Sequence, residues 1–186
     1  MTPFHFLFGL ALAISLPFGS AEPETPSLPY YDYGACPFEC CTYGTWTAKE
    51  ETILRKEHSD STPAVTVVKA GEDVHGLSGV VITTEAGEVK ILKKINFSVE
   101  NSREEILLLP GDVIYPLRYV GEGYDKFYFA GIFLVGRTNI KSVGKSEEWQ
   151  VIHLPKWFWW AKVRRHNGEL GWTRELDHFA HVDACE

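Results

Sequence analysis

The sequence has few of the features that mark nucleic-acid-binding or helical proteins. Its 18 Lys and Arg residues are outnumbered by 25 Asp and Glu residues, which gives a net charge of −7, and they form no long basic run. This argues against a protein that follows a nucleic-acid backbone. Helical periodicity is almost absent, and a single Met with 13% aromatic residues favours rigid, β-rich packing. With 45% hydrophobic and 23% charged residues, the 186-residue chain is a folded protein of one medium or two small domains.

Residues 1–21 contain no Asp, Glu, Lys or Arg. Phe6–Leu16 is an apolar run rich in Leu, Ala and Phe, and Gly19-Ser20-Ala21 supplies the small residues of a cleavage site. This pattern is typical of a secretory signal peptide, although no basic residue precedes the apolar run. The run is too short for a transmembrane helix, which needs about 20 residues. We therefore expect an exported chain, periplasmic or secreted, without a transmembrane segment.

The chain has only four cysteines, Cys36, Cys40, Cys41 and Cys185, and in an exported protein they are expected to form disulfides. Of the three pairings, the one that joins the adjacent Cys40 and Cys41 requires a strained ring. Each of the other two joins Cys185 to Cys40 or Cys41 and leaves Cys36 with the remaining one. The alternative is a zinc site of three thiolates and one His, but a second closely spaced cysteine pair is missing.

Short β-branched and aromatic runs separated by turn residues follow the cysteines. The runs that fit strands are Val65–Val68, Gly79–Thr84, Val89–Leu92, Val113–Leu117, Phe127–Val135 and Trp157–Val163. Asn167-Gly168 is the strongest hairpin signal in the chain. Ser102–Glu105 is compatible with the start of one helical turn, which Pro110-Gly111 ends. The sequence therefore predicts an all-β fold with minimal helix, a small barrel or a sandwich.

A weak internal repeat suggests two related β units. Ala70–Val74 and Pro110–Val113 each contain a Gly turn and an acidic residue before a Val that opens a strand. Each unit alone would bury too little surface to be stable, so we expect the two to pack together. We divide the chain into a signal peptide (1–21), a Pro-rich leader with the cysteine cluster (22–44), a first unit (45–100) and a second unit with a C-terminal tail (101–186).

Several segments share a pattern of strands, a Gly turn with an acidic residue, and a later Gly-Trp pair. These segments are Thr52–Arg55, Pro63–Val67, Gly71–Val74, Ala161–Arg164 and Gly168–Trp172. Together they resemble bacterial SH3-like (SH3b) domains, with Ser78–Val81 replacing the Gly-Trp pair of the first unit and an aromatic hairpin added around Tyr124–Val135.

This resemblance implies two tandem SH3-like small β-barrels, packed together and cross-linked by the disulfides. It also implies that Gly171 allows a close backbone approach and that Trp172 is largely buried where it closes a barrel. The SH3-like domains bind cell-wall or peptide ligands or serve as spacers, and the resemblance implies no catalytic residue.

The run Trp157-Phe158-Trp159-Trp160 is the most informative aromatic feature. Strand alternation places Trp157 and Trp159 on one face and Phe158 and Trp160 on the other. One pair can fill a core, and the other is either covered by the partner unit or offered to a ligand. We expect Trp157 and Trp159 to lie at the seam between the units. The alternative is an aromatic binding groove, with the candidate residues Tyr115, Tyr124, Tyr128, Trp157 and Trp159.

Residues with catalytic or metal-binding potential are few. His178 and His181 are weak metal candidates, because no third, distant ligand is evident. Ser78 lacks the spacing of a nucleophilic serine, and the chain has no Gly loop of the phosphate-binding kind. Every cysteine can be paired, which disfavours a thiol nucleophile. We therefore expect no enzyme and no cofactor.

These features favour an exported, non-catalytic binding or scaffolding module that recognises cell-wall peptidoglycan or an extended peptide of a protein partner. One alternative is a small metal-dependent or thiol cell-wall hydrolase, which cysteine titration and a metal assay test. Another is a purely structural protein that oligomerises through its aromatic face, which the mass in solution tests. The oligomeric state stays open, and no nucleic-acid partner is expected.

Overall fold

The fold is all-β, as the sequence predicts. A computed structural model describes residues 24–138 and 140–185, so the predicted signal peptide lies outside the described residues. The first sheet contains β1 (Tyr30–Tyr33), β2 (Thr45–Ala48), β3 (Thr52–Arg55), β4 (Ala64–Val68), β5 (Asp73–Glu85), β14 (Lys156–Arg165), β15 (Leu170–Thr173) and β16 (Phe179–Ala180). The second contains β6 (Glu88–Ile91), β7 (Ile95–Val99), β8 (Glu105–Leu108), β9 (Val113–Gly121), β10 (Tyr124–Phe129), β11 (Ile132–Arg137), β12 (Gly144–Lys145) and β13 (Trp149–His153). The only helix of the described residues is a 3-10 turn, η1 (Leu176–His178).

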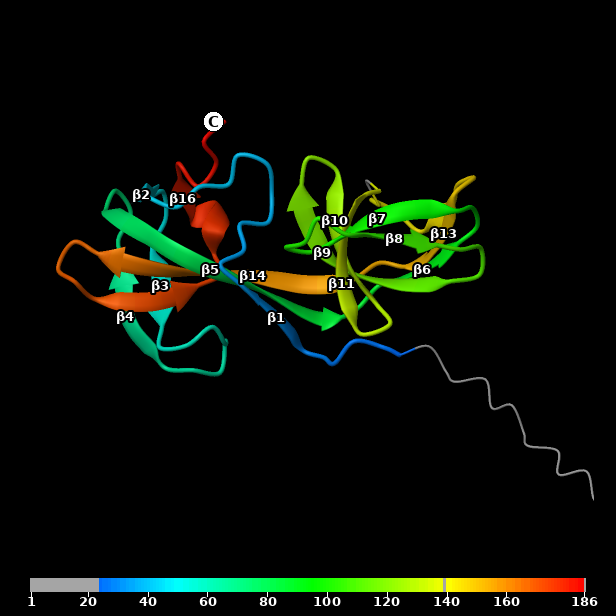
Figure 1. Cartoon of the computed structure of the whole chain (residues 1–186). Coiled ribbons are helices and arrows are strands. Elements are labelled where there is room, and N and C mark those ends of the chain that lie inside the picture. The colour runs from blue at the N-terminus through cyan, green and yellow to red at the C-terminus, as the bar shows by residue number, and fades with distance from the viewer. Residues whose placement is uncertain (1–23, 139, 186) are drawn as a thin grey trace, which may run out of the picture.

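The second sheet is inserted into the first, and the two lie side by side (Figure 1). The chain leaves the first sheet after β5, completes the second sheet, and returns along β14, which pairs antiparallel with β5 over nearly its whole length. The expected division at residues 100 and 101 is therefore wrong. It falls within the second sheet, between β7 and β8, and the two units are nested rather than tandem.

Both sheets nevertheless repeat the same order of strands. The order β16-β2-β5-β14-β15-β3-β4 of the first sheet corresponds position by position to β13-β6-β9-β10-β11-β7-β8 in the second. The internal repeat marks equivalent turns: Gly71 and Gly111 have φ values of 81° and 101°. Their N–H groups donate to the carbonyls of Ala48, at the end of β2, and Ile91, at the end of β6, over 2.7 and 2.9 Å. The repeat is thus a trace of two related units.

A second pair of glycines allows core side chains to pack against a neighbouring strand. A Cβ on Gly171 of β15 would lie 2.6 Å from the Cβ of Leu54 on β3. In the equivalent place on β11, a Cβ on Gly136 would lie 2.5 Å from the ring of Phe97 on β7. A larger residue fits at neither position without moving its neighbour. The close approach expected at Gly171 is present, and its equivalent recurs in the second sheet.

The turns account for the remaining differences from the expected strands. Phe127–Val135 is a hairpin of β10 and β11 rather than one strand, with Ala130 and Gly131 at φ values of 45° and 85° in its turn. The helical turn considered at Ser102–Glu105 is wrong: Ser102 Oγ accepts the Glu104 N–H over 3.1 Å in a turn, and β8 begins directly after it. The Asn167-Gly168 hairpin is confirmed between β14 and β15.

The end of the Pro-rich leader is a strand, because β1 pairs antiparallel with residues 80–83 in the C-terminal half of β5. Asp32 on β1 forms ion pairs with Arg118 and Lys126 of the second sheet, and Lys126 also pairs with Glu100 over 2.6 Å. The Arg118 and Lys126 side chains are only 8% and 3% exposed. Burial lowers the pKa of Lys126, but its hydrogen bonds to the two carboxylates outweigh this effect and leave the pKa raised. The network fixes the leader between the two sheets.

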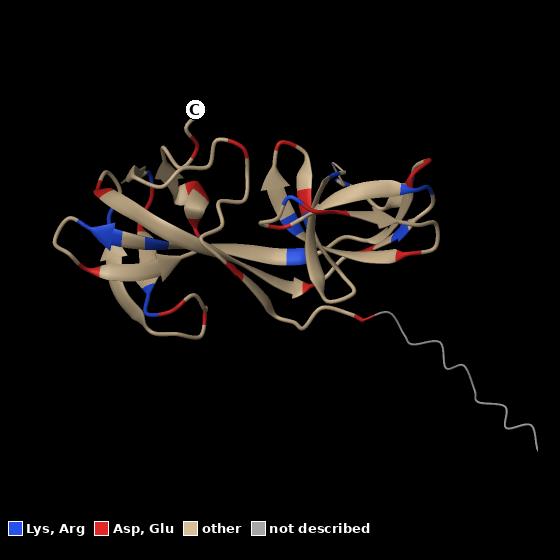
Figure 2. Cartoon of the chain, viewed as in Figure 1, with Lys and Arg blue, Asp and Glu red and all other residues tan. Residues whose placement is uncertain are grey.

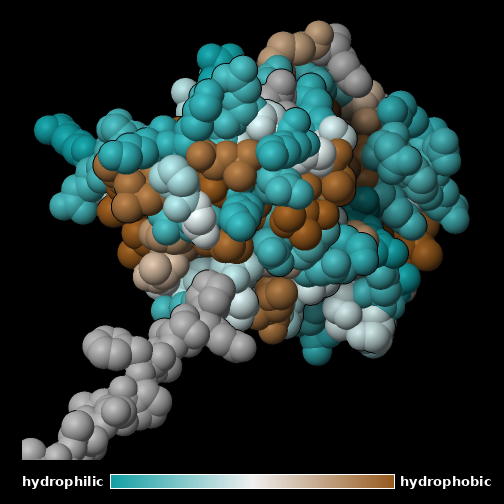
Figure 3. Space-filling view, turned by 90° about the vertical axis from the view of Figure 1, so that its right-hand side faces the viewer, coloured by the Kyte–Doolittle hydropathy of each residue, from teal (hydrophilic) through white to brown (hydrophobic). Residues whose placement is uncertain are grey.

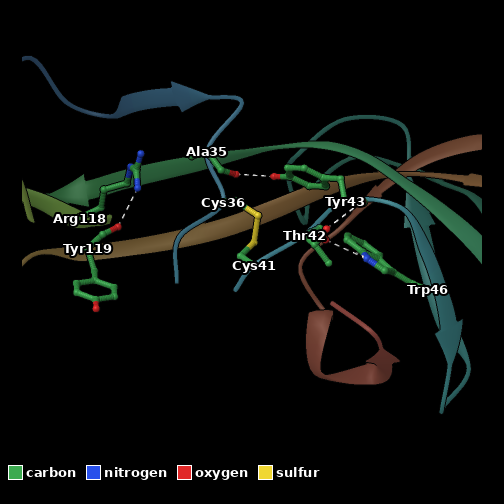
Figure 4. Close-up of a disulfide and its surroundings, with 8 residues drawn as sticks. All are labelled: Ala35, Cys36, Cys41, Thr42, Tyr43, Trp46, Arg118 and Tyr119. Atoms are coloured by element: carbon green, nitrogen blue, oxygen red, sulfur yellow. Dashed lines mark hydrogen bonds between the residues drawn. A yellow bond between two sulfur atoms is a disulfide. The ribbon is translucent and has the colours of Figure 1, made fainter. Parts of the chain in front are cut away.

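Two disulfides involve the cysteine cluster that follows the leader, and one of them reaches the C-terminal tail. Cys36 bonds Cys41, across a separation of 5 residues, and Cys40 bonds Cys185, across 145 residues. We call them the short-range and the long-range disulfide. This is one of the two pairings left open by the sequence, and it ties the C-terminal tail to the cysteine cluster as expected. Figure 4 shows the short-range disulfide beside Tyr43, whose hydroxyl donates to a backbone carbonyl of the same loop over 2.5 Å.

Candidate functional site

Strand β14 carries aromatic side chains on both of its faces. Its register with β5 pairs Trp159 with Val81 and Phe158 with Ile82. Trp157 and Trp159 contact the core of the first sheet, whereas Trp160 lies in a separate small cluster on the opposite face. The alternation expected from the sequence is therefore confirmed.

The inner face of β14 is the one that faces the core of the first sheet, and its side chains pack against other residues of that core. Trp159 is 8% exposed and lies 5.6 Å from the ring of Phe38 and 6.4 Å from that of Tyr43, edge to face in both cases. Burial is the main cause that raises the pKa of Tyr43. Trp157 is half-buried and lines a cavity between the sheets. Trp159 therefore packs in the core of the first sheet, beside a cavity that its ring lines with Phe38, and not at the expected seam between the units. Trp157 alone of the two lines the cavity between the sheets.

The outer face of the same strand carries a second, smaller apolar cluster. Val80, Ile82 and Trp160 are buried there, and Trp172 of β15 packs against them. Trp172 is partly buried, but in this cluster rather than in the core of a barrel, where the resemblance implies that it lies. The cause is its direction: it lies on the outer side of β15, whereas the core of the first sheet lies on the other side.

Five rings form what we call the outer aromatic surface: Tyr31, Tyr33, His58, Phe158 and Trp172. Tyr31 and Tyr33 stack with centroids 6.1 Å apart, and the His58 ring lies 5.7 and 6.1 Å from them. His58 also lies 5.2 Å from Trp172. Tyr31, Phe158 and Tyr33 are 41%, 45% and 65% exposed. Large aromatic rings thus remain accessible on one side of the sheet.

Two cations border these rings. The Arg174 guanidinium lies over Phe158 at 5.4 Å and over Trp160 at 5.9 Å, and Lys162 Nζ lies 5.9 Å from the Trp172 centroid. Arg174 also forms an ion pair with Asp60 over 2.9 Å. Cation–π contacts of this kind hold the rim of the surface in place.

The two tyrosines of this surface owe their direction to the buried ion pairs. Successive residues of a strand point to opposite faces, so when Asp32 points inward to Arg118 and Lys126, Tyr31 and Tyr33 point outward. Sequence reasoning missed these residues, because it assigned them to the Pro-rich leader and expected no strand before the cysteines. The signal that identifies them is the alternation of aromatic, acidic and aromatic residues, typical of a strand with one buried face.

The three tyrosines predicted as ligand-binding residues are not part of this surface. Tyr115 and Tyr128 are each 9% exposed, lie opposite one another on β9 and β10, and belong to a buried cluster with Leu117. Tyr124 is 39% exposed on β10, with Arg137 5.9 Å from its ring. The structure brings none of them together with Trp159 into one groove.

The second sheet exposes apolar side chains in a different manner. Leu107 and Leu109 are 53% and 46% exposed, and Figure 3 shows apolar patches on this end of the molecule divided by hydrophilic side chains. Scattered exposure of this kind is normal for a protein surface. Figure 2 shows Lys and Arg interspersed with Asp and Glu on both sheets.

The candidate metal ligands do not form a set. Among the described residues, the only group of metal-ligating side chains is Cys40, Asp183 and Cys185, and its two thiols are joined in the long-range disulfide. His178 Nδ1 instead lies 3.1 Å from the hydroxyl of Thr52. All four cysteines are in disulfides, so the chain as described offers no thiolate nucleophile.

No family model, curated protein or solved structure matches the chain. The resemblance to SH3-like domains therefore stays a prediction from the residues. No helix of the described residues is long and apolar enough to cross a membrane. The two disulfides are of the kind that forms in oxidising compartments.

Proposed function

We propose that this chain is an exported, non-catalytic binding module, and that its outer aromatic surface binds an extended segment of a partner protein. The observation that carries the proposal is the exposure of Tyr31, Tyr33 and Phe158 together on one side of a sheet. Tyr and Trp rings dominate the energetics of protein interfaces, because they offer large rigid area and a polar group at low cost in conformational entropy.

An extended peptide suits this surface better than a compact domain. Peptides in polyproline II or β conformation dock on rows of aromatic rings, which take their apolar side chains while a ring hydroxyl or indole N–H binds a backbone carbonyl. Tyr31, Tyr33 and Trp172 provide both kinds of group. The cations Lys162 and Arg174 at the rim favour a peptide with acidic residues beside its apolar ones.

The test uses the full mature chain as bait for a phage-displayed library of random peptides and, in parallel, for insoluble peptidoglycan. We expect enrichment of extended peptides that combine proline or aromatic residues with acidic ones. The Tyr33→Ala variant should lose this binding by at least tenfold and keep its melting temperature, because Tyr33 is 65% exposed.

Tyr124→Ala is the matched control, since Tyr124 is a similarly exposed tyrosine on the other sheet. Its binding should equal that of the wild type. Equal loss in both variants contradicts the assignment of the site. Retention by peptidoglycan alone, sensitive to Tyr33→Ala, replaces the peptide with a cell-wall glycopeptide. A dimer at low concentration that Tyr33→Ala converts to monomer makes the surface an oligomer interface instead.

A further inference from the structure

A cavity of about 390 Å³ lies where the two sheets meet, away from the outer aromatic surface. We call it the junction cavity. Its wall is mostly apolar: Pro116, Ile140, Leu154 and Pro155 come from the second sheet and its connections, and Trp157 comes from the inner face of β14. The volume is within the range of small-ligand sites, about 300–1,000 Å³.

One carboxylate lines this apolar wall. Asp125 of β10 is 6% exposed. Its Oδ2 atom accepts two hydrogen bonds, from the Thr138 hydroxyl over 2.5 Å and from the Ile140 N–H over 3.4 Å. Among the described residues, no donor to Oδ1 is present. Burial raises the pKa of Asp125, and the two hydrogen bonds oppose this effect only in part.

Asp125 also has no counter-ion among the described residues. Its neighbour Lys126 points to the opposite face of β10 and is committed to Asp32 and Glu100. Lys141 lines the cavity but is exposed, and it forms no ion pair with Asp125. The contrast with the fully paired charges around Lys126 shows that this chain neutralises its buried charges elsewhere.

A buried carboxylate without a cation is costly, so it either takes up a proton or acquires a cationic partner, and such a group in a cleft is a candidate for a binding site. We propose that the junction cavity binds an ammonium or guanidinium group on an apolar body, with the Asp125 carboxylate as its counter-ion. The Trp157 ring and the two prolines then form the wall against which the apolar body lies. The group can belong to a free amine or to a Lys or Arg side chain of a polypeptide.

A purely structural role for Asp125 makes a different prediction. If the carboxylate served only to accept the hydrogen bonds of Thr138 and Ile140, an Asn carbonyl would accept them equally well, and nothing would require the charge. The Asp125→Asn variant therefore separates the two roles: it retains the acceptor and removes the counter-ion.

The experiment measures binding to the full mature chain by calorimetry and by the change in tryptophan fluorescence. The probes are benzylamine against benzyl alcohol, and a blocked Gly-Lys-Gly peptide against blocked Gly-norleucine-Gly. We expect each cationic probe to bind at least tenfold more tightly than its neutral counterpart. Preference between benzylamine and the Lys peptide distinguishes a small-molecule site from one for a protein side chain.

Asp125→Asn should abolish this discrimination without lowering the melting temperature. Asp112→Asn is the matched control, because Asp112 also accepts a backbone N–H, that of Leu109 over 2.7 Å, but lies in a turn outside the cavity. It should bind like the wild type. The proposal is overturned if no cationic probe binds the wild type, if the neutral probes bind equally, or if Asp125→Asn leaves the discrimination intact. Should Asp125→Asn unfold, the cation-to-neutral ratio of the wild type still decides.

Discussion

The adjacent residues Phe158 and Trp159 should respond to the same substitution in opposite ways. Trp159 is 8% exposed in the core of the first sheet, whereas Phe158 is 45% exposed on the outer aromatic surface. An aromatic residue buries about 150–250 Å², which at about 25 cal/mol per Å² is worth about 4–6 kcal/mol. Ala retains part of this area and the site relaxes in part, so we expect Trp159→Ala to lower the free energy of unfolding by about 3–5 kcal/mol.

Phe158→Ala removes roughly half as much buried area, and no closed cavity remains. We expect a loss of about 1–2 kcal/mol, because area-based figures are upper limits. Urea unfolding followed by far-UV circular dichroism measures both values, and the slope of the transition must be unchanged for the comparison to hold. In a chain of this size, the Trp159→Ala loss corresponds to a fall in melting temperature of about 6–20 °C.

The same two variants should also differ in peptide binding. Phe158→Ala should weaken peptide capture while the protein stays folded, and Trp159→Ala should weaken capture only in proportion to the unfolded fraction. A Trp159→Ala variant as stable as the wild type that no longer binds would refute the placement of Trp159 in the core. It would restore the groove on the inner face as the site.

Three further perturbations test other parts of the structure. Removal of the long-range disulfide by double Ser substitution should cost about 5 kcal/mol by the chain-entropy relation for 145 residues, against about 2 kcal/mol for the short-range disulfide with 5; equal losses in urea unfolding would contradict this ranking. Asp32→Asn should lower the free energy of unfolding by about 3–5 kcal/mol, because it leaves the buried Arg118 guanidinium without a carboxylate and Lys126 with Glu100 alone; limited proteolysis should then cut the leader, and an uncut leader would argue against the network as its anchor. Asp125 should make the wild type more stable than Asp125→Asn at low pH, and this difference in the free energy of unfolding should shrink as the pH rises from about 4 to about 7. The reason is that the pKa of Asp125 is raised in the folded state, so its contribution to stability is greatest below the ordinary carboxyl pKa of 3.8. A difference that grows with pH would refute the raised pKa.

Several strands of this protein could be predicted from local pattern, because their side chains alternate between a buried and an exposed face, whereas β1, β7 and β8 were not among the expected runs. The expected runs at Val65–Val68 and Trp157–Val163 fall within β4 and β14. The alternation also placed Trp159 and Phe158 on opposite faces of β14. The Gly71 and Gly111 turns marked the duplication, since a positive φ favours glycine at each.

The nesting of the two units could not be predicted in the same way. Strand pairing between β5 and β14 depends on contacts between distant parts of the chain, and no local signal marks where an inserted unit begins. The segments that resemble SH3-like domains were divided between two expected units, yet β3, β4, β5, β14 and β15 all belong to one sheet. The hairpin at Gly168 was correct locally, and its partner strand β3 was assigned to the wrong unit.

The candidate site was only partly predictable, because hydropathy does not distinguish the two faces of a sheet with cores on both sides. Trp157 and Trp159 were singled out for their size, but size alone favours burial as much as binding. Tyr31 and Tyr33 became part of a surface only through Asp32, whose cationic partners lie in the other sheet. The outward direction of these two tyrosines thus depends on ion pairs with the second sheet, which the local alternation of residues does not reveal.

The nested arrangement also explains why both candidate sites lie along β14. This strand closes the first sheet after the second has been completed, so its inner face meets the second sheet at the junction cavity while its outer face remains open to solvent. One strand therefore presents Trp157 to a cavity and Phe158 to the outer aromatic surface in consecutive positions. Because the two side chains point in opposite directions, a ligand in the cavity and a peptide on the surface would occupy separate faces. Changes at Asp125 and at Tyr33 should then act independently: the loss of binding free energy in the double variant should equal the sum of the losses in the two single variants.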